Sequence, residues 1–342
     1  ESLELRVIKM PWNNATAPNV MLEVTDACNI TCRTCYKKKG TSFKSLDQIQ
    51  RDLEAGARLR PLHTVTISGG EPTLHPDLCR IVELVKKQQV HVFLLTNGVL
   101  LDQSYVRRLK VSGLDSILFH VDRDQQRPDL PVQPDFEAVR ARLSELIRLA
   151  VSSKLDVSVS ATLYANYREF LRELSDFVLN TQDITFLYIA RGIDPEVLTS
   201  AEGRKSHAER AGQDGLSVEA IRTFYEEEYG VEPFAYIPAT AGNKAVWLSY
   251  FIPVIKRGCE RTLFRIRSNS CDVLMMEIAK VITGRHIHKT TQQPLLTSLR
   301  VVLNTLTSLR PRMLIEFLAA LSSPSASLRH KMIAYDNGPA IA

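Results

Sequence analysis

The feature that most constrains the fold of this 342-residue chain is the regular alternation of β-rich runs and amphipathic stretches up to about residue 190. The runs have the composition of strands, and each stretch between them is long enough for a helix that crosses back over a sheet. The predicted strands span residues 19–25, 63–69, 90–96, 115–122, 155–163 and 183–190. The predicted helices span residues 45–60, 75–88, 102–112, 135–152 and 166–179.

Strands that alternate with helices form a parallel sheet with right-handed crossovers. The spacing leaves open whether the sheet is flat or curls into part of a barrel, but both forms carry their sites at the carboxyl ends of the strands. The unusual sequence of the chain follows those ends: TDACNITCRTC, SGGEPTLHP, TNG and HVDRDQQRPD come after the first four strands. We therefore expect a functional site along this edge.

Cys28, Cys32 and Cys35 place half of the six cysteines within eight positions. Three thiolates with C-x3-C-x2-C spacing can each bind a different iron of a [4Fe–4S] cube, which leaves the fourth iron without a protein ligand. Zinc is an alternative, but a structural zinc site normally has four protein ligands, and the sequence contains no second C-x2-C pair. A chance grouping of buried thiols is the third interpretation.

The order and context of CNITCRTC and GGEP (69–72) resemble the radical S-adenosylmethionine (SAM) superfamily. The resemblance continues to about residue 195 and implies an α/β fold, a partial (β/α)6 TIM-like barrel. It also implies an enzyme in which the three cysteines hold a [4Fe–4S] cluster whose open iron binds SAM. An electron from a reductant such as flavodoxin or ferredoxin would cleave SAM, and the resulting 5′-deoxyadenosyl radical would abstract hydrogen from the substrate.

The same resemblance implies a set of SAM-binding residues. GGEP would lie against the methionyl ammonium of SAM, although without the cysteines it reads equally well as a strand-to-helix turn. Asp122 ends the fourth strand, and Asn166 either caps the following helix or faces SAM. The full set is Gly69, Gly70, Glu71, Pro72, Thr96, Asn97, Asp122 and Asn166.

Other residues along this edge give weaker signals. Arg123 and Arg127 belong to a polar stretch and either bind a phosphate or carboxylate of the substrate or are solvated. His120 is interpreted as a strand residue, and Leu187 and Ile189 as core residues. The catalytic residues themselves stay open.

Four regions follow from these patterns: an N-terminal segment (1–18), the barrel core (19–195), a polar loop or lid with a helix (196–230), and a C-terminal extension (231–342). The apolar stretches 272–282 and 294–321 predict that the extension is mainly helical. Because the extension holds only Cys259 and Cys271, we expect a single cluster in the chain.

The net charge of +5 is concentrated in the tail, where residues 256–342 contain 13 Lys/Arg against 5 Asp/Glu. A basic, apolar tail can pack on the barrel, lie on an anionic membrane or bind an apolar substrate. Binding of nucleic acid is disfavoured because aromatic residues are not interleaved with the charges. The first expectation is therefore a lipid or isoprenoid-like substrate. The alternatives are a small phosphorylated or nucleotide-like metabolite, and a noncatalytic iron–sulfur or zinc scaffold.

The expected location is the cytoplasm, with peripheral membrane contact through the tail as an extension of that expectation. No apolar stretch reaches the roughly 18 uncharged residues of a membrane span, and the start ESLELRVIKMPWNN lacks the apolar region of a signal peptide. Clustered cysteines fit a reducing compartment better than a disulfide framework.

Overall fold

In the computed structural model the chain divides into two compact units, Asn14–Leu216 with Pro339–Ala342, and Glu1–Asn13 with Ser217–Gly338. Every candidate site residue belongs to the first of these units. The structure describes residues 7–9, 20–32, 35, 37, 39–59, 62, 64–121, 125–164, 167–181, 183–191, 218–229, 235–241, 244–257, 260–263, 288–290 and 330–336.

The first unit is built on a parallel sheet with the strand order β9-β8-β6-β5-β4-β2. Each strand lies within one residue of its predicted span, which confirms the predicted α/β class and the parallel sheet. The strands are β2 (Val20–Glu23), β4 (Thr64–Ser68), β5 (His91–Thr96), β6 (Ser116–His120), β8 (Asp156–Leu163) and β9 (Ile184–Arg191).

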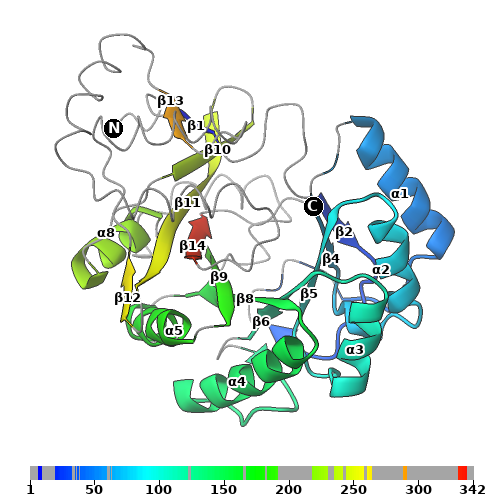
Figure 1. Cartoon of the computed structure of the whole chain (residues 1–342), viewed down its shortest axis with the longest axis horizontal. Helices are drawn as coiled ribbons and strands as arrows, with labels where there is room; N and C mark the ends of the chain where they lie inside the picture. The colour runs from blue at the N-terminus through cyan, green and yellow to red at the C-terminus, as the bar shows by residue number, and fades with distance from the viewer. Residues whose placement is uncertain are drawn as a thin grey trace. The chain divides into compact units, whose positions relative to one another are not determined.

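Five α-helices connect these strands and lie along one side of the curved sheet (Figure 1). Two of them begin at an aspartate cap, because Asp102 accepts a hydrogen bond from the Tyr105 amide and Asp135 from the Ala138 amide. The helices are α1 (Leu46–Leu59), α2 (Leu78–Lys86), α3 (Gln103–Val111), α4 (Phe136–Ser152) and α5 (Arg168–Asn180).

The two faces of the sheet differ in chemistry because side chains alternate along each strand. One alternate set is apolar and fully buried, and it includes the predicted core residues Leu187 and Ile189. The other set contains hydroxyl and imidazole groups, among which the His91 ring lies 2.7 Å from the Ser116 hydroxyl and the His120 ring lies 2.9 Å from that of Ser160. The apolar set on the central strands is Val92, Leu94, Ile117, Phe119, Val157 and Val159.

The second unit contains the predicted helix, α8 (Val218–Tyr229), and several strands that were not predicted. Its longest strand, β11 (Lys244–Arg257), pairs antiparallel with three others. β11 combines β-branched and aromatic residues, a strand composition that the sequence analysis had treated only as part of a basic, apolar tail. Besides β11, the described strands of this unit are β1 (Val7–Lys9), β10 (Ala235–Ala241), β12 (Glu260–Leu263), β13 (His288–Thr290) and β14 (His330–Asp336).

Several predictions fall on parts of the chain that the structure does not describe. The apolar stretches 272–282 and 294–321 lie outside the described residues, so their helical structure stays a prediction. The described residues from 235 onward all lie in strands, so the prediction of a mainly helical extension is wrong for that part. The polar loop or lid after residue 196 also lies outside them up to the start of α8. Within the described ranges, no helix combines the length and apolar character that crossing a bilayer requires.

Candidate active site

The three clustered cysteines lie on the loop that follows β2, at the carboxyl edge of the sheet. Cys28, Cys32 and Cys35 are all half-buried. Burial raises the pKa of the Cys28 thiol, and the negative charges of Glu71 and Cys35 act in the same direction. Because metals bind the thiolate, loading this loop would release protons that neutral pH otherwise leaves in place.

Among the residues that the structure describes, no three or more His, Cys, Asp or Glu side chains group closely enough to hold a metal ion. The structure thus brings the three cysteines onto one loop but does not converge them on one point. The thiolates of a [4Fe–4S] cube bind different iron atoms, so a cube does not require ligands that meet at a single ion.

The two glycines of GGEP let one backbone pack directly against another. A Cβ atom at Gly69, whose φ is +145°, would lie 2.4 Å from the Thr25 carbonyl oxygen, and one at Gly70 would lie 2.2 Å from that of Ala27. The Gly70 and Glu71 amides donate to these same two carbonyls at 2.8 and 2.7 Å. The sequence predicted that the glycines lie against a ligand, whereas in the structure the Gly70 and Glu71 amides lie against the cysteine loop.

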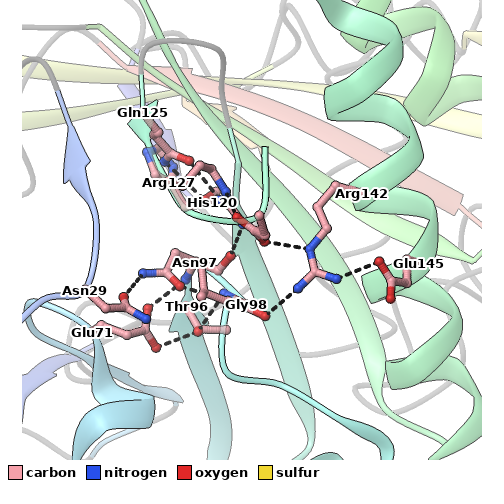
Figure 2. A network of polar contacts seen from close by, with 12 residues as sticks. Asn29, Glu71, Thr96, Asn97, Gly98, His120, Gln125, Arg127, Arg142 and Glu145 are labelled. Carbon is pink, nitrogen blue, oxygen red and sulfur yellow. Dashed lines mark hydrogen bonds and ion pairs between the residues drawn. The ribbon is translucent and has the colours of Figure 1, made fainter. Parts of the chain in front are cut away.

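The Glu71 carboxylate joins the ends of β4 and β5 (Figure 2). It is 1% exposed, and its Oε1 accepts hydrogen bonds from the Thr73 amide at 3.0 Å, the Thr73 hydroxyl at 2.6 Å and the Thr96 hydroxyl at 2.6 Å. Its Oε2 accepts a fourth from the Asn97 amide at 2.8 Å. A buried carboxylate with four donors is well compensated for its loss of water, and it fixes both strand ends.

Asn97 extends this connection to the cysteine loop. Its Nδ2 donates to Asn29 Oδ1 at 2.8 Å, and its Oδ1 accepts from the Val99 amide at 2.9 Å. Pro72, the last residue of GGEP, is the first residue of a short 3-10 helix, η2 (Pro72–Leu74), for which Glu71 is the N-cap. GGEP, Thr96, Asn97 and the cysteine loop are therefore one connected structure, as their shared position at the strand ends predicted.

Arg127, in the segment after β6, stabilises the same region. The sequence did not indicate this role. Its side chain is 0% exposed. It donates to both carboxylate oxygens of Asp129 at 2.7 and 2.8 Å, to Gln125 Oε1 at 2.9 Å and to the Asn97 carbonyl at 2.8 Å. The expectation that it is solvated or meets a substrate anion is therefore wrong, because its anion is Asp129, two residues further along the chain.

A second arginine completes the network drawn in Figure 2. Arg142 on α4 donates to Asp129 at 2.7 Å and to the Gly98 carbonyl at 3.0 Å. Partial burial alone would raise the pKa of Asp129, but hydrogen bonds and charges from Arg127 and Arg142 outweigh it and hold that pKa below its ordinary value. The Asp129 carboxylate thus stays ionised and connects α4 to the strand ends.

The segment after β6 also touches the cysteine loop directly. The short strand β3 (Thr31–Cys32) pairs antiparallel with β7 (Gln125–Gln126), which sets Cys32 opposite Gln125. His120 is the last residue of β6, as predicted. The other two candidate residues, Asp122 and Asn166, lie outside the described part of the chain, together with Arg123, Cys259 and Cys271.

Comparison with known proteins agrees with this geometry. Residues 22–162 match the model of the Radical SAM superfamily, so the chain contains a radical SAM domain. A probable GTP 3′,8-cyclase of Methanococcus maripaludis is 32% identical over 142 residues, which are 38% of this chain and 46% of that protein. A 7,8-dihydro-6-hydroxymethylpterin dimethyltransferase of Methanocaldococcus jannaschii is 31% identical over 127 residues, 35% of this chain and 25% of that protein.

The chain thus spans less than half the length of these two curated relatives. Among solved structures, anSMEcpe with bound AdoMet has a TM-score of 0.42 at 19% identity and covers 53% of this chain and 52% of its own. Streptococcus suis SuiB bound to its precursor peptide SuiA has a TM-score of 0.45 at 16% identity, with 64% and 53% covered. The fold assignment above rests on strand order and pairing.

Substituting Gly70 by alanine tests the close packing of GGEP on the cysteine loop. The new Cβ would meet a backbone carbonyl that cannot rotate away, so Gly70→Ala should lower the free energy of unfolding by about 2 kcal/mol. The matched control is Gly56→Ala inside α1, where the nearest side-chain atom is 3.8 Å away and the change should stabilise by up to ~1 kcal/mol. Denaturant unfolding measures both. Equal stability of the two variants would contradict the packing described here.

Replacing Asp129 tests the buried ion-pair network. Asp129→Asn should lower the free energy of unfolding at pH 7 by about 3 kcal/mol, because it leaves the buried Arg127 guanidinium without its counter-charge. The pKa of Asp129 is depressed in the folded chain, so its contribution is complete above the ordinary carboxyl range near pH ~4 and is lost as the pH falls through the folded value. The difference between wild type and variant should therefore shrink in acid.

The control for this network is Glu137→Gln, which breaks the exposed ion pair with Arg140 at the start of α4. Exposed pairs contribute little, so its unfolding curve should overlay that of the wild type. A wild-type-like curve for Asp129→Asn at pH 7, or a difference that grows in acid, would contradict the proposed role of Asp129.

Proposed function

We propose that this chain is a radical SAM enzyme in which Cys28, Cys32 and Cys35 hold a [4Fe–4S] cluster and the carboxyl edge of the sheet binds SAM. The observation that carries this proposal is the attachment of the cysteine loop to GGEP through Glu71 and the two glycines. That attachment joins the motif for the cluster to the motif for SAM. The alternatives of a noncatalytic iron–sulfur or zinc scaffold offer no reason for this second motif.

The residues of the loop fit the cluster in chemistry. Three half-buried thiols are the donor set that an iron–sulfur cube with one open iron uses. GGEP also suits SAM. The carbonyl oxygens of Glu71 and Pro72 already accept from the Leu74 and His75 amides, but those of Gly69 and Gly70 are acceptors that suit an ammonium group.

When bound, a reduced cluster and SAM supply one-electron chemistry that yields a hydrogen-abstracting radical. The part of the protein is to bind, orient and shield. The three cysteines would bind the cluster as thiolates, and the raised pKa of Cys28 makes the loss of its own proton depend on metal binding. The buried network of Glu71, Asn97 and Arg127 holds the surrounding backbone rigid, as catalysis by positioning requires. The electron donor proposed is flavodoxin or ferredoxin.

We further propose a polar, nucleotide-like or pterin-like substrate. The face of the sheet opposite the apolar set supports this, because it carries hydrogen-bonding groups in the His91–Ser116 and His120–Ser160 pairs. The names of the two curated relatives, with GTP and a pterin, point the same way. The lipid or isoprenoid-like alternative, with peripheral membrane contact, depends on residues 294–321 outside the described structure and stays a prediction.

Anaerobic reconstitution tests the proposal. Wild-type chain should bind about four irons and, once reduced, convert SAM to methionine and 5′-deoxyadenosine. Cys32→Ala should lose both the iron and the SAM cleavage, whereas Cys79→Ala, which removes a half-buried thiol on α2, should retain both. Iron analysis and chromatography of the SAM products are the measurements. Zinc in place of iron, or equal loss in both variants, would contradict the assignment.

The substrate class is tested with the same reconstituted protein. Deuterium from labelled purine nucleotides or pterins should appear in 5′-deoxyadenosine, and deuterium from a lipid extract should not. Transfer from the lipid fraction alone would overturn the polar substrate in favour of the apolar one.

A further inference from the structure

The amide of Asn29 presents a buried donor that no part of the chain described by the structure satisfies. Its Nδ2 is buried and has no hydrogen-bond partner among the described residues, while its Oδ1 accepts from Asn97. Buried side-chain donors in native proteins are nearly always paired, so an orphan points to a group that the protein is built to meet. Asn29 directly follows Cys28, the first of the three clustered cysteines.

The direction in which this amide points is fixed by a chain of hydrogen bonds that begins at the backbone. The Val99 amide can only donate, so the Asn97 atom that it contacts at 2.9 Å is the oxygen Oδ1. The Nδ2 of Asn97 therefore faces Asn29, and the atom that it contacts at 2.8 Å must be an acceptor, Oδ1. This leaves the Nδ2 of Asn29 on the other side. An exchange of nitrogen and oxygen at either residue would place like groups against each other.

The surroundings keep this relay rigid (Figure 2). The backbone of Asn97 is held on both sides, because its amide donates to Glu71 and its carbonyl accepts from the buried Arg127. Asn97 therefore cannot turn to relieve the orphan donor without breaking bonds to two charged groups. Since the described residues offer no acceptor, a group that binds to the loop is the partner that would satisfy Asn29.

We infer that Asn29 donates its Nδ2–H to a sulfur of the cluster held by Cys28, Cys32 and Cys35, which makes it a positioning residue that tunes the cluster. The inference rests on the proposed function. Cluster sulfurs are negatively charged acceptors, and hydrogen bonds to them stabilise the more negative, reduced form. Asn29 thus favours acceptance of the electron that begins the reaction. SAM also has oxygens that accept hydrogen bonds, so it is the alternative partner of the Asn29 amide. The test distinguishes it from the cluster.

The test is an EPR-monitored redox titration of the reconstituted protein without SAM. Asn29→Leu keeps the size of the side chain and removes the donor, and should lower the ratio of reduced to oxidised cluster at a fixed potential about tenfold. Asn180→Leu makes the same substitution at the exposed end of α5 and should leave the ratio unchanged. Pulse EPR on protein labelled with 15N in its asparagine side chains should detect a coupling that Asn29→Leu abolishes and Asn180→Leu keeps.

A second variant controls for the case in which Asn29→Leu fails to fold. Asn29→Asp retains an acceptor for Asn97 but cannot donate when ionised, so it should also disfavour reduction while binding about four irons. An unchanged ratio in both variants, or an unchanged nitrogen coupling, would overturn the inference. Weaker SAM binding with an unchanged ratio would also overturn it and assign the amide to SAM. Failure of the proposed function is distinct, because the wild type itself would then bind no cluster.

Discussion

The site depends on one buried carboxylate. Glu71 accepts four hydrogen bonds from Thr73, Thr96 and Asn97, and its own amide donates to the Ala27 carbonyl in the cysteine loop. Three segments far apart in the sequence therefore converge on a single residue that is 1% exposed. Because a buried charge is tolerated only when donors surround it, the position of each segment constrains the other two.

The charged side chains around Glu71 form a second layer of contacts, in which a carboxylate is again surrounded by donors. Asp129 is held between Arg127 and Arg142, which also donate to the Asn97 and Gly98 carbonyls at the end of β5. The antiparallel pair of β3 and β7 then ties the segment after β6 to Cys32. The cysteine loop is thus supported from two sides. A cysteine loop supported in this way can keep the geometry that the proposed radical chemistry needs.

The sequence was sufficient to predict the parallel sheet, since each strand is a β-branched run that ends at turn residues, as TVTIS ends at Gly69 and Gly70. It also predicted that GGEP, Thr96 and Asn97 share one edge with the cysteines. It could not reveal the partners of Glu71, because a hydrogen bond across 25 residues leaves no local pattern. The prediction for Arg127 was wrong for a related reason. A charged residue in a polar stretch is expected to be solvated, and only the tertiary contacts show that it is buried beside Asp129. The strand β11 was not predicted because the extension was interpreted by its charge and not by the β-branched and aromatic composition of this segment.

The central claim is that the Glu71 side chain fixes the ends of β4 and β5 beside the cysteine loop, and hydrogen–deuterium exchange of Glu71→Gln tests it most directly. Glutamine places an NH2 group where one carboxylate oxygen accepted a hydrogen bond, so donors that met that oxygen lose their acceptor. The account predicts that the amides of Gly70 and Asn97 exchange about tenfold faster in the variant, while amides within α4 keep their wild-type rates. Wild-type exchange at Gly70 and Asn97 would contradict it.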